Sequence, residues 1–228
     1  MKSHIQSKVT FMKFETILWD FDGIFINTPS QNGYIHYYQA AEKVAKACGI
    51  NLSATEIHEK WNISQQNGKK YEMSIDVLIY EYGVCPHLAL ELIHKFLIQD
   101  HLDNYTANTE LIYSLEYLKD KQHILVTHAH KNWTDHWTEK LLIDSFFSNA
   151  FFVKTEELCK HSIEDTYDKI LQRFDIKPET TAMIEDTNRN LIFAEKSQIT
   201  PILFNETPSA NGFKTFNNSI DLIYALAN

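Results

Sequence analysis

Short runs of apolar residues recur along the chain, and each is followed by polar residues and then by a segment with helical periodicity. These runs cover residues 16–19, 123–127, 150–153, 181–184 and 201–204. Strands that alternate with helices are joined by right-handed crossovers, which place the strands parallel in one sheet with helices on both faces. The pattern therefore predicts an α/β fold with a doubly wound, mostly parallel sheet.

The stretch from residue 29 to residue 105 departs from this alternation, because it shows helical periodicity without a convincing strand. We expect helices near residues 32–48, 54–65, 71–82 and 86–101. Ser53 with Glu56 three residues later is a capping-box signature at the start of one of them. The pattern predicts two domains: an α/β core of residues 12–28 and 106–228, and an inserted all-helical domain of residues 29–105.

Composition limits the kind of protein that this chain can be. Its 228 residues carry a net charge of -9, and an acidic surface repels phosphate backbones, so we expect no nucleic-acid partner. No apolar run is long enough to span a membrane, and we expect no membrane association. Three scattered cysteines form no CxxC pair, which favours a reducing compartment. We therefore expect a cytoplasmic monomer or homodimer.

Polar and charged residues gather where the predicted strands end. They are Asp20, Asp22, Thr127, Lys154, Lys160, Glu185 and Asp186. In an open parallel sheet, ligands bind outside the carboxyl ends of the strands. An ionised carboxylate is costly to bury unless it is paired or binds a metal, and clustered carboxylates suit Mg²⁺. A hydroxyl and an ammonium group suit an anionic ligand, so the pattern predicts phosphoryl chemistry on a metal.

Four motifs in this order resemble the haloacid dehalogenase-like (HAD) superfamily, in its phosphatase branch. They are DFDG at residues 20–23, ILVTH at 124–128, the lysine of CKHSIEDTYDKIL at 160, and IEDTNRNLIFAEKSQI at 184–199. The resemblance extends from about residue 16 to residue 204. The helical insert stands where this family carries an α-helical cap, so the resemblance implies a cap domain with hinges near residues 27–30 and 105–108.

The resemblance also implies a role for each site residue. Asp20 would be the nucleophile that forms an aspartyl-phosphate, and Asp22 would be the general acid and base. Mg²⁺ would be bound by Asp20, the backbone carbonyl of Asp22, Asp186 and, through water, Glu185. The phosphoryl group of the substrate would be bound by Phe21, Gly23, Thr127, His128 and Lys160.

Several assignments stay open. His161 follows Lys160 where the family usually has proline, so Lys154 is a competing site lysine, although Lys160 is preferred. Further candidates are Asn190 near the metal and, for reading the substrate, Gly68 and Lys69. His128 and His130 lack cysteine or carboxylate partners at zinc-ligand spacing, so zinc is not expected. Trp133 and Trp137 are interpreted as packing residues.

The favoured hypothesis is a Mg²⁺-dependent phosphomonoesterase that hydrolyses a small phosphorylated metabolite. Phosphoglycolate, a sugar phosphate and a nucleoside monophosphate all fit. Asp22 disfavours dehalogenation, because a departing halide needs no proton. The alternatives are a phosphomutase of the same family and a catalytically silent relative that still binds phosphate.

Overall fold

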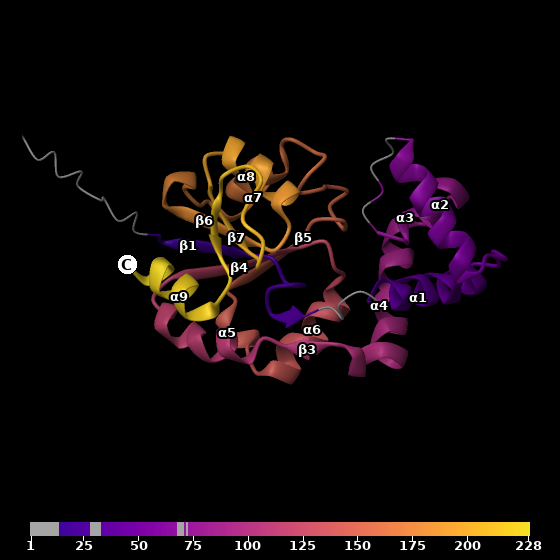
Figure 1. The fold of residues 1–228 in the computed structure, drawn as a ribbon, viewed down its shortest axis with the longest axis horizontal. Coiled ribbons are helices and arrows are strands. Elements are labelled where there is room, and N and C mark those ends of the chain that lie inside the picture. Colours follow the sequence, from indigo (N-terminus) through magenta and orange to yellow (C-terminus); the bar gives the residue numbers. More distant parts are fainter. Residues whose placement is uncertain (1–13, 28–32, 68–70, 72) are drawn as a thin grey trace, which may run out of the picture.

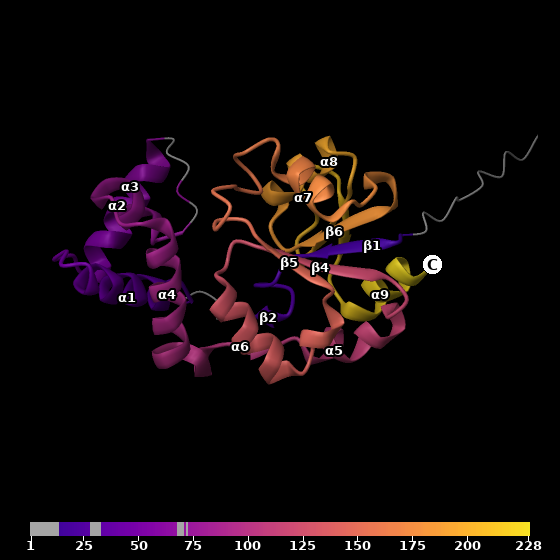
Figure 2. The ribbon, with the colours of Figure 1, turned by 180° about the vertical axis from the view of Figure 1, so that it is seen from behind.

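The computed structural model describes residues 14–27, 33–67, 71 and 73–228, with only the backbone for residues 33 and 34 (Figures 1 and 2). Within these ranges, one all-parallel sheet has the strand order β5-β4-β1-β6-β7-β8. Its strands are β1 (Thr16–Trp19), β4 (Gln122–Thr127), β5 (Asn149–Phe152), β6 (Thr181–Glu185), β7 (Thr200–Phe204) and β8 (Lys214–Phe216). The predicted doubly wound α/β fold is confirmed.

The central strand β1 is buried on both faces, as its four-residue run TILW requires. Because side chains alternate along a strand, Ile17 and Trp19 join one apolar cluster, and Leu18 joins another on the opposite face. Helices α5 (Thr109–Ser114), α6 (Lys131–Leu141) and α9 (Ser219–Ala227) cover the first face, and α7 (Thr166–Phe174) and α8 (Ile192–Lys196) cover the second (Figure 1). Short 3₁₀ turns are formed by Leu102–Asn104, Leu115–Leu118, Asp144–Phe146, Pro178–Thr180 and Asn188–Leu191.

Four helices lie together beside the sheet, and we call this group the helical lobe (Figure 1). It consists of α1 (Gly33–Ala47), α2 (Ala54–Gln66), α3 (Asp76–Tyr82) and α4 (Pro86–His101). The capping box of Ser53 and Glu56 is present at the start of α2. The prediction of a helix over 71–82 was wrong in length: α3 begins only at Asp76, whose carboxylate accepts a hydrogen bond from the Met73 N–H. None of the helices in the described ranges is both long and apolar enough to span a membrane.

Two short strands tie together the segments that lead into and out of the helical lobe. Strand β2 (Ile26–Asn27) pairs antiparallel with β3 (Thr106–Ala107). The side chain of Asn108 reinforces the pair by donating to the Ile24 carbonyl at 3.2 Å. Residues 28–30 of the expected hinge lie outside the described residues, and the domain boundaries at 28 and 105 stay a prediction.

Candidate active site

Asp20 directly follows β1, which lies between β4 and β6 in the middle of the sheet. Its backbone N–H donates to the Ile184 carbonyl, so the residue continues the sheet at its carboxyl edge. The side chain is buried, and its Oδ1 accepts a hydrogen bond of 2.6 Å from Lys160 Nζ. Burial and the nearby Glu185 carboxylate raise the pKa of Asp20 to about 8, against the opposing effect of Lys160. The strand end therefore holds a buried carboxylate that depends on nearby positive charge.

Lys160 comes from the loop after β5 and is fully buried. Its ammonium group contacts Asp20 Oδ1 and Glu185 Oε1, each at 2.6 Å, and the Val126 carbonyl at 3.3 Å. Burial alone would lower the pKa of Lys160, but the two carboxylates outweigh it and hold that pKa above its usual range. A buried ammonium between two carboxylates is the partner that both of them need.

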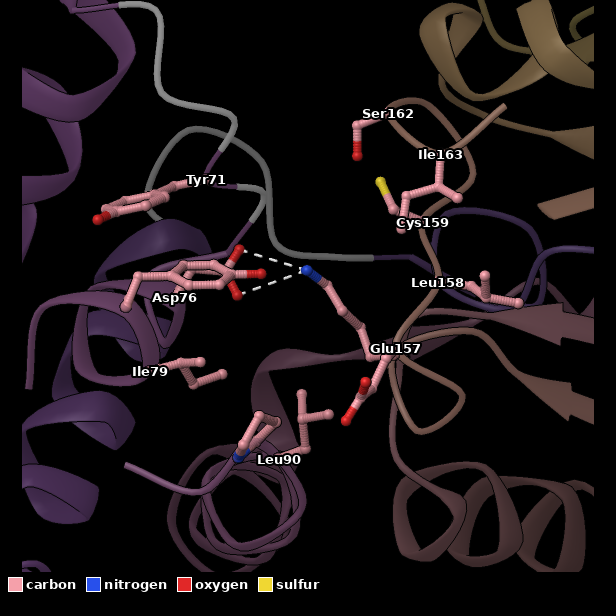
Figure 3. Close-up of a pocket in the computed structure, with 12 residues that line it drawn as sticks. Tyr71, Asp76, Ile79, Leu90, Glu157, Leu158, Cys159, Ser162 and Ile163 are labelled. Carbon is pink, nitrogen blue, oxygen red and sulfur yellow. Dashed lines mark hydrogen bonds and ion pairs between the residues drawn. The ribbon is translucent and has the colours of Figure 1, made fainter. Parts of the chain in front are cut away.

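Lys154, the competing lysine, points to a different partner. Its Nζ lies 3.5 Å from both carboxylate oxygens of Asp76 on α3, so it bridges the core to the helical lobe (Figure 3). The structure therefore brings Lys160, and not Lys154, to Asp20.

Glu185 and Asp186 supply two further carboxylates at the end of β6. Each oxygen of Glu185 has a protein donor: Lys160 and Asn190 Nδ2 bond Oε1, and the Thr187 N–H bonds Oε2 at 2.7 Å. Burial raises the pKa of Glu185, but Lys160 and these donors hold it below its usual range. Burial, Glu185 and Asp20 raise the pKa of Asp186 to about 9. Asn190, a sequence candidate, thus orients Glu185.

The three carboxylates of Asp20, Glu185 and Asp186 each offer an oxygen within 4.8 Å of the others. Only oxygen donors are present, which is the ligand type that Mg²⁺ prefers. Burial, together with repulsion between these groups, raises the pKa of Asp20 and of Asp186, and the charge of a bound divalent cation would offset both effects. The residues present therefore fit a magnesium ion.

Gly23 allows the chain to pass directly beside this cluster. Its φ is +84°, in the left-handed region, and a Cβ added there would lie 2.1 Å from Asp186 Oδ2. Only glycine fits both the backbone conformation and the space. The glycine of the DFDG motif is thus needed because the backbone at this position passes close to the Asp186 side chain. This requirement is separate from the phosphate contact that the resemblance implies.

Thr127 and His128 lie at the end of the neighbouring strand β4. The buried Thr127 hydroxyl accepts a hydrogen bond from the Ala129 N–H at 3.0 Å. His128 Nε2 accepts one from the Lys160 N–H at 3.3 Å, which joins this strand end to residues 153–165, the loop after β5 that we call the lysine loop. Burial and the positive charge of Lys160 lower the pKa of His128. The Phe21 side chain packs in the core, so this residue can offer a ligand only its backbone.

Asp22 has a partner that the sequence interpretation missed. The indole N–H of Trp133, on α6, donates to Asp22 Oδ1 at 2.9 Å. Burial raises the pKa of Asp22 to about 6, while Trp133 and Lys160 act to lower it. Trp133 and Trp137 are spaced four apart on an apolar helix face, which indicates only packing. Trp137 matches that interpretation, since its indole N–H has no partner among the described residues.

A cavity of about 580 Å³ separates the helical lobe from the core next to the lysine loop (Figure 3). Ile79 and Leu90 of the helical lobe and Tyr71, which precedes α3, line one side, and Leu158 and Cys159 line it from the core. Its wall therefore reaches the residue next to Lys160. Gly68 and Lys69, the expected substrate-reading residues, lie outside the described residues.

The family model described as haloacid dehalogenase-like hydrolase matches residues 17–204. No curated protein matches the sequence.

Solved structures with the same fold have low sequence identity to this chain. A HAD phosphatase from Thermococcus onnurineus is 17% identical, with a TM-score of 0.62, covering 93% of this chain and 98% of that one. The hydrolase YfnB from Bacillus subtilis, solved with magnesium, is 14% identical with a TM-score of 0.64, covering 95% and 100%. A dehalogenase solved as an intermediate complex is 13% identical with a TM-score of 0.60, covering 95% and 98%. At such identities these structures show the shared fold.

The family match covers most of the chain and includes all four motifs that converge on Asp20. The chain therefore belongs to the haloacid dehalogenase-like hydrolase family.

Proposed function

We propose that this hydrolase is a Mg²⁺-dependent phosphomonoesterase that acts on a small phosphorylated metabolite through an aspartyl-phosphate intermediate. The observation that carries the proposal is that two aspartates at one strand end have different hydrogen-bond partners. Asp20 contacts the Lys160 ammonium at 2.6 Å, whereas Asp22 contacts a neutral indole N–H at 2.9 Å. Lys160 thus stabilises the anionic form of Asp20, which bound Mg²⁺ would favour further, whereas burial raises the pKa of Asp22 to about 6 and lets this residue carry a proton.

The reaction assigns one step to each group. An Asp20 oxygen forms a bond to phosphorus as the ester P–O bond breaks, and Asp22 gives its proton to the departing oxygen. Water then attacks phosphorus, Asp22 takes a proton from it, and phosphate leaves with the Asp20 carboxylate restored. Mg²⁺, when bound by Asp20, Asp186 and the Asp22 carbonyl, would reduce the electrostatic repulsion between the anionic nucleophile and the anionic phosphate. Lys160 holds Asp20 in place and adds positive charge at the phosphoryl group.

The helical lobe acts in this proposal as a cap. The ion pair of Lys154 with the buried Asp76 links it to the core beside the cavity, and the paired strands β2 and β3 carry both connections. A cap that closes over the site would exclude bulk water and contact the leaving group. The apolar and aromatic wall that Tyr71, Ile79 and Leu90 form favours a leaving group with apolar surface.

The first test is phosphate release from p-nitrophenyl phosphate with Mg²⁺ and then with excess EDTA, followed by a panel of phosphorylated metabolites. We expect hydrolysis that EDTA abolishes and Mg²⁺ restores. A parallel assay of halide release from a 2-haloacid should be negative, because Asp22 serves a leaving oxygen that needs a proton. Halide release without phosphate release would contradict the proposal. Isomerised hexose phosphate without free phosphate would indicate a mutase, and inactivity toward every substrate a silent relative.

Replacing Trp133 with phenylalanine should shift the alkaline limb of the rate profile to higher pH. The indole N–H stabilises the ionised form of Asp22, so its removal raises a pKa that burial already places at about 6. The protonated acid is the active form, so activity would persist to higher pH. The measurement is kcat/KM against pH. Trp137→Phe is the control, because it removes similar packing without touching Asp22; equal shifts in both variants would count against the assignment.

A further inference from the structure

Three potential metal ligands of another chemical type lie next to the carboxylate site. One ring nitrogen of His128, one of His161 and the Sγ of Cys159 all lie within 4.8 Å of one another. Cys159 is buried and both histidines are half-buried. His128 comes from the end of β4, and the other two flank Lys160 in the loop after β5. The fold therefore brings two nitrogens and a sulfur together from segments about 30 residues apart (161 − 128 = 33).

The hydrogen bonds around His161 orient it as a ligand. Asn190 Nδ2 donates to Glu185 Oε1 at 2.5 Å, which turns Asn190 Oδ1 toward His161 Nδ1 at 3.0 Å. Because an amide oxygen only accepts, Nδ1 of His161 carries the proton, and the lone pair of the neutral ring lies on Nε2. An outer amide or carboxylate that fixes the tautomer in this way is typical of metal-binding histidines.

The other two ligands are held by backbone contacts. His128 Nε2 accepts from the Lys160 N–H, so its lone pair is directed at the segment that carries Cys159 and His161. At 3.3 Å this hydrogen bond is long, and a metal ion would replace it. The Thr166 hydroxyl donates to the Cys159 carbonyl at 2.9 Å and accepts from its N–H at 3.3 Å. These bonds hold the backbone of Cys159 in the loop, and its Sγ lies within 4.8 Å of a ring nitrogen of each histidine.

We propose that His128, Cys159 and His161 form a binding site for a thiophilic divalent cation such as Zn²⁺, distinct from the carboxylate site for Mg²⁺. Zinc bonds of about 2.3 Å to sulfur and about 2.0 Å to nitrogen place the ligand atoms of a tetrahedral ion roughly 3.5 Å apart. Side-chain rotations that move the ligand atoms by about an ångström would bring them to these separations. The thiol proton is released as the Zn–S bond forms.

The two clusters would bind different metal ions, because their ligand atoms differ. The site of Asp20, Glu185 and Asp186 offers oxygen alone, which suits Mg²⁺, whereas two nitrogens and a thiolate suit zinc or cobalt. Cys159 also lines the 580 Å³ cavity, which gives an ion and its water ligand a route to the site (Figure 3). An ion there would cross-link the segment after Thr127 to the lysine loop.

The test is a titration with Co²⁺, as a spectroscopic probe, at saturating Mg²⁺. We expect a sulfur-to-cobalt charge-transfer absorption in the wild type, no such absorption in Cys159→Ser, and binding weakened at least about tenfold in His161→Gln. The controls are Cys85→Ser and His87→Gln, two exposed residues elsewhere in the chain, which should bind as the wild type does. Absorption that survives in Cys159→Ser, or that disappears in Cys85→Ser, would overturn the proposal.

A second measurement needs no variant and so does not depend on how the variants fold. X-ray absorption at the zinc edge on wild-type protein with one equivalent of Zn²⁺ and saturating Mg²⁺ should show one sulfur near 2.3 Å and two nitrogens near 2.0 Å. A shell of oxygens alone would place the zinc at the carboxylate cluster and overturn the proposal. Neither readout uses catalysis, so failure here is distinct from failure of the proposed hydrolysis.

Discussion

Asp20→Asn should lower the turnover number by at least about a thousandfold, about 4 kcal/mol in the activation barrier. A carboxamide cannot form the bond to phosphorus, although its oxygen can still accept the 2.6 Å hydrogen bond from Lys160. The substitution also removes a charge that repels Glu185, and Lys160 keeps the Glu185 carboxylate at 2.6 Å as its partner, so the free energy of unfolding should change little. The measurement is single-turnover phosphate release, with urea unfolding in parallel.

The matched control is Asp103→Asn, which makes the same chemical change at an exposed position of the chain. It should keep the wild-type rate. If Asp20→Asn retained more than about a tenth of the wild-type rate, a change below about 1.4 kcal/mol, Asp20 would not be the nucleophile.

The second large effect is expected from Lys160→Met, which keeps the apolar stem and removes the ammonium group. Asp20 and Glu185 then lose the cation that lies 2.6 Å from each of them. Breaking a buried ion pair by removing one partner typically costs about 3–5 kcal/mol of stability. Urea unfolding without metal should show a loss of this size, and Mg²⁺ should restore more stability to this variant than to the wild type.

Lys154→Met is the comparison, since Lys154 is the rival lysine in the same loop. Its partner is Asp76 on the helical lobe, 3.5 Å away. We expect Lys160→Met to be inactive or nearly so and Lys154→Met to stay within about tenfold of the wild-type rate, about 1.4 kcal/mol. Equal losses of rate in the two variants would show that Lys160 is not the single site lysine.

The predicted strands and the helices beside them depend on local patterns and agree well with the structure. Helix α4 has the predicted bounds, because Pro86 begins it and its apolar residues repeat with helical period. Strand β8 escaped prediction, since its three residues KTF are partly exposed and show no apolar run. The two-residue strands β2 and β3 escaped for a similar reason: pairing between distant segments defines them.

The candidate site likewise combines features that local patterns predict with contacts that they do not. The order of motifs predicted that Asp20, Thr127 and Asp186 lie together at strand ends, because the carboxyl ends of parallel strands meet at one edge. The bond from Trp133 to Asp22 could not be inferred, since helix periodicity shows that a tryptophan is buried without showing what its N–H meets. The cluster of His128 with Cys159 and His161 could not be predicted either, because its ligands come from two segments that lie about 30 residues apart in the sequence.

The sequence by itself determined the α/β class, the helical insert and the set of chemical groups at the sheet edge. Those properties follow from periodicity and from residue types at strand ends, which are local. Only the tertiary structure decided which lysine meets Asp20, 140 residues away in the chain, and which side chain meets Asp22, 111 residues away. Such contacts depend on the course of the loop after β5 and on the rotation of α6 against the sheet. Packing of the whole core sets both, and no short stretch of sequence encodes either.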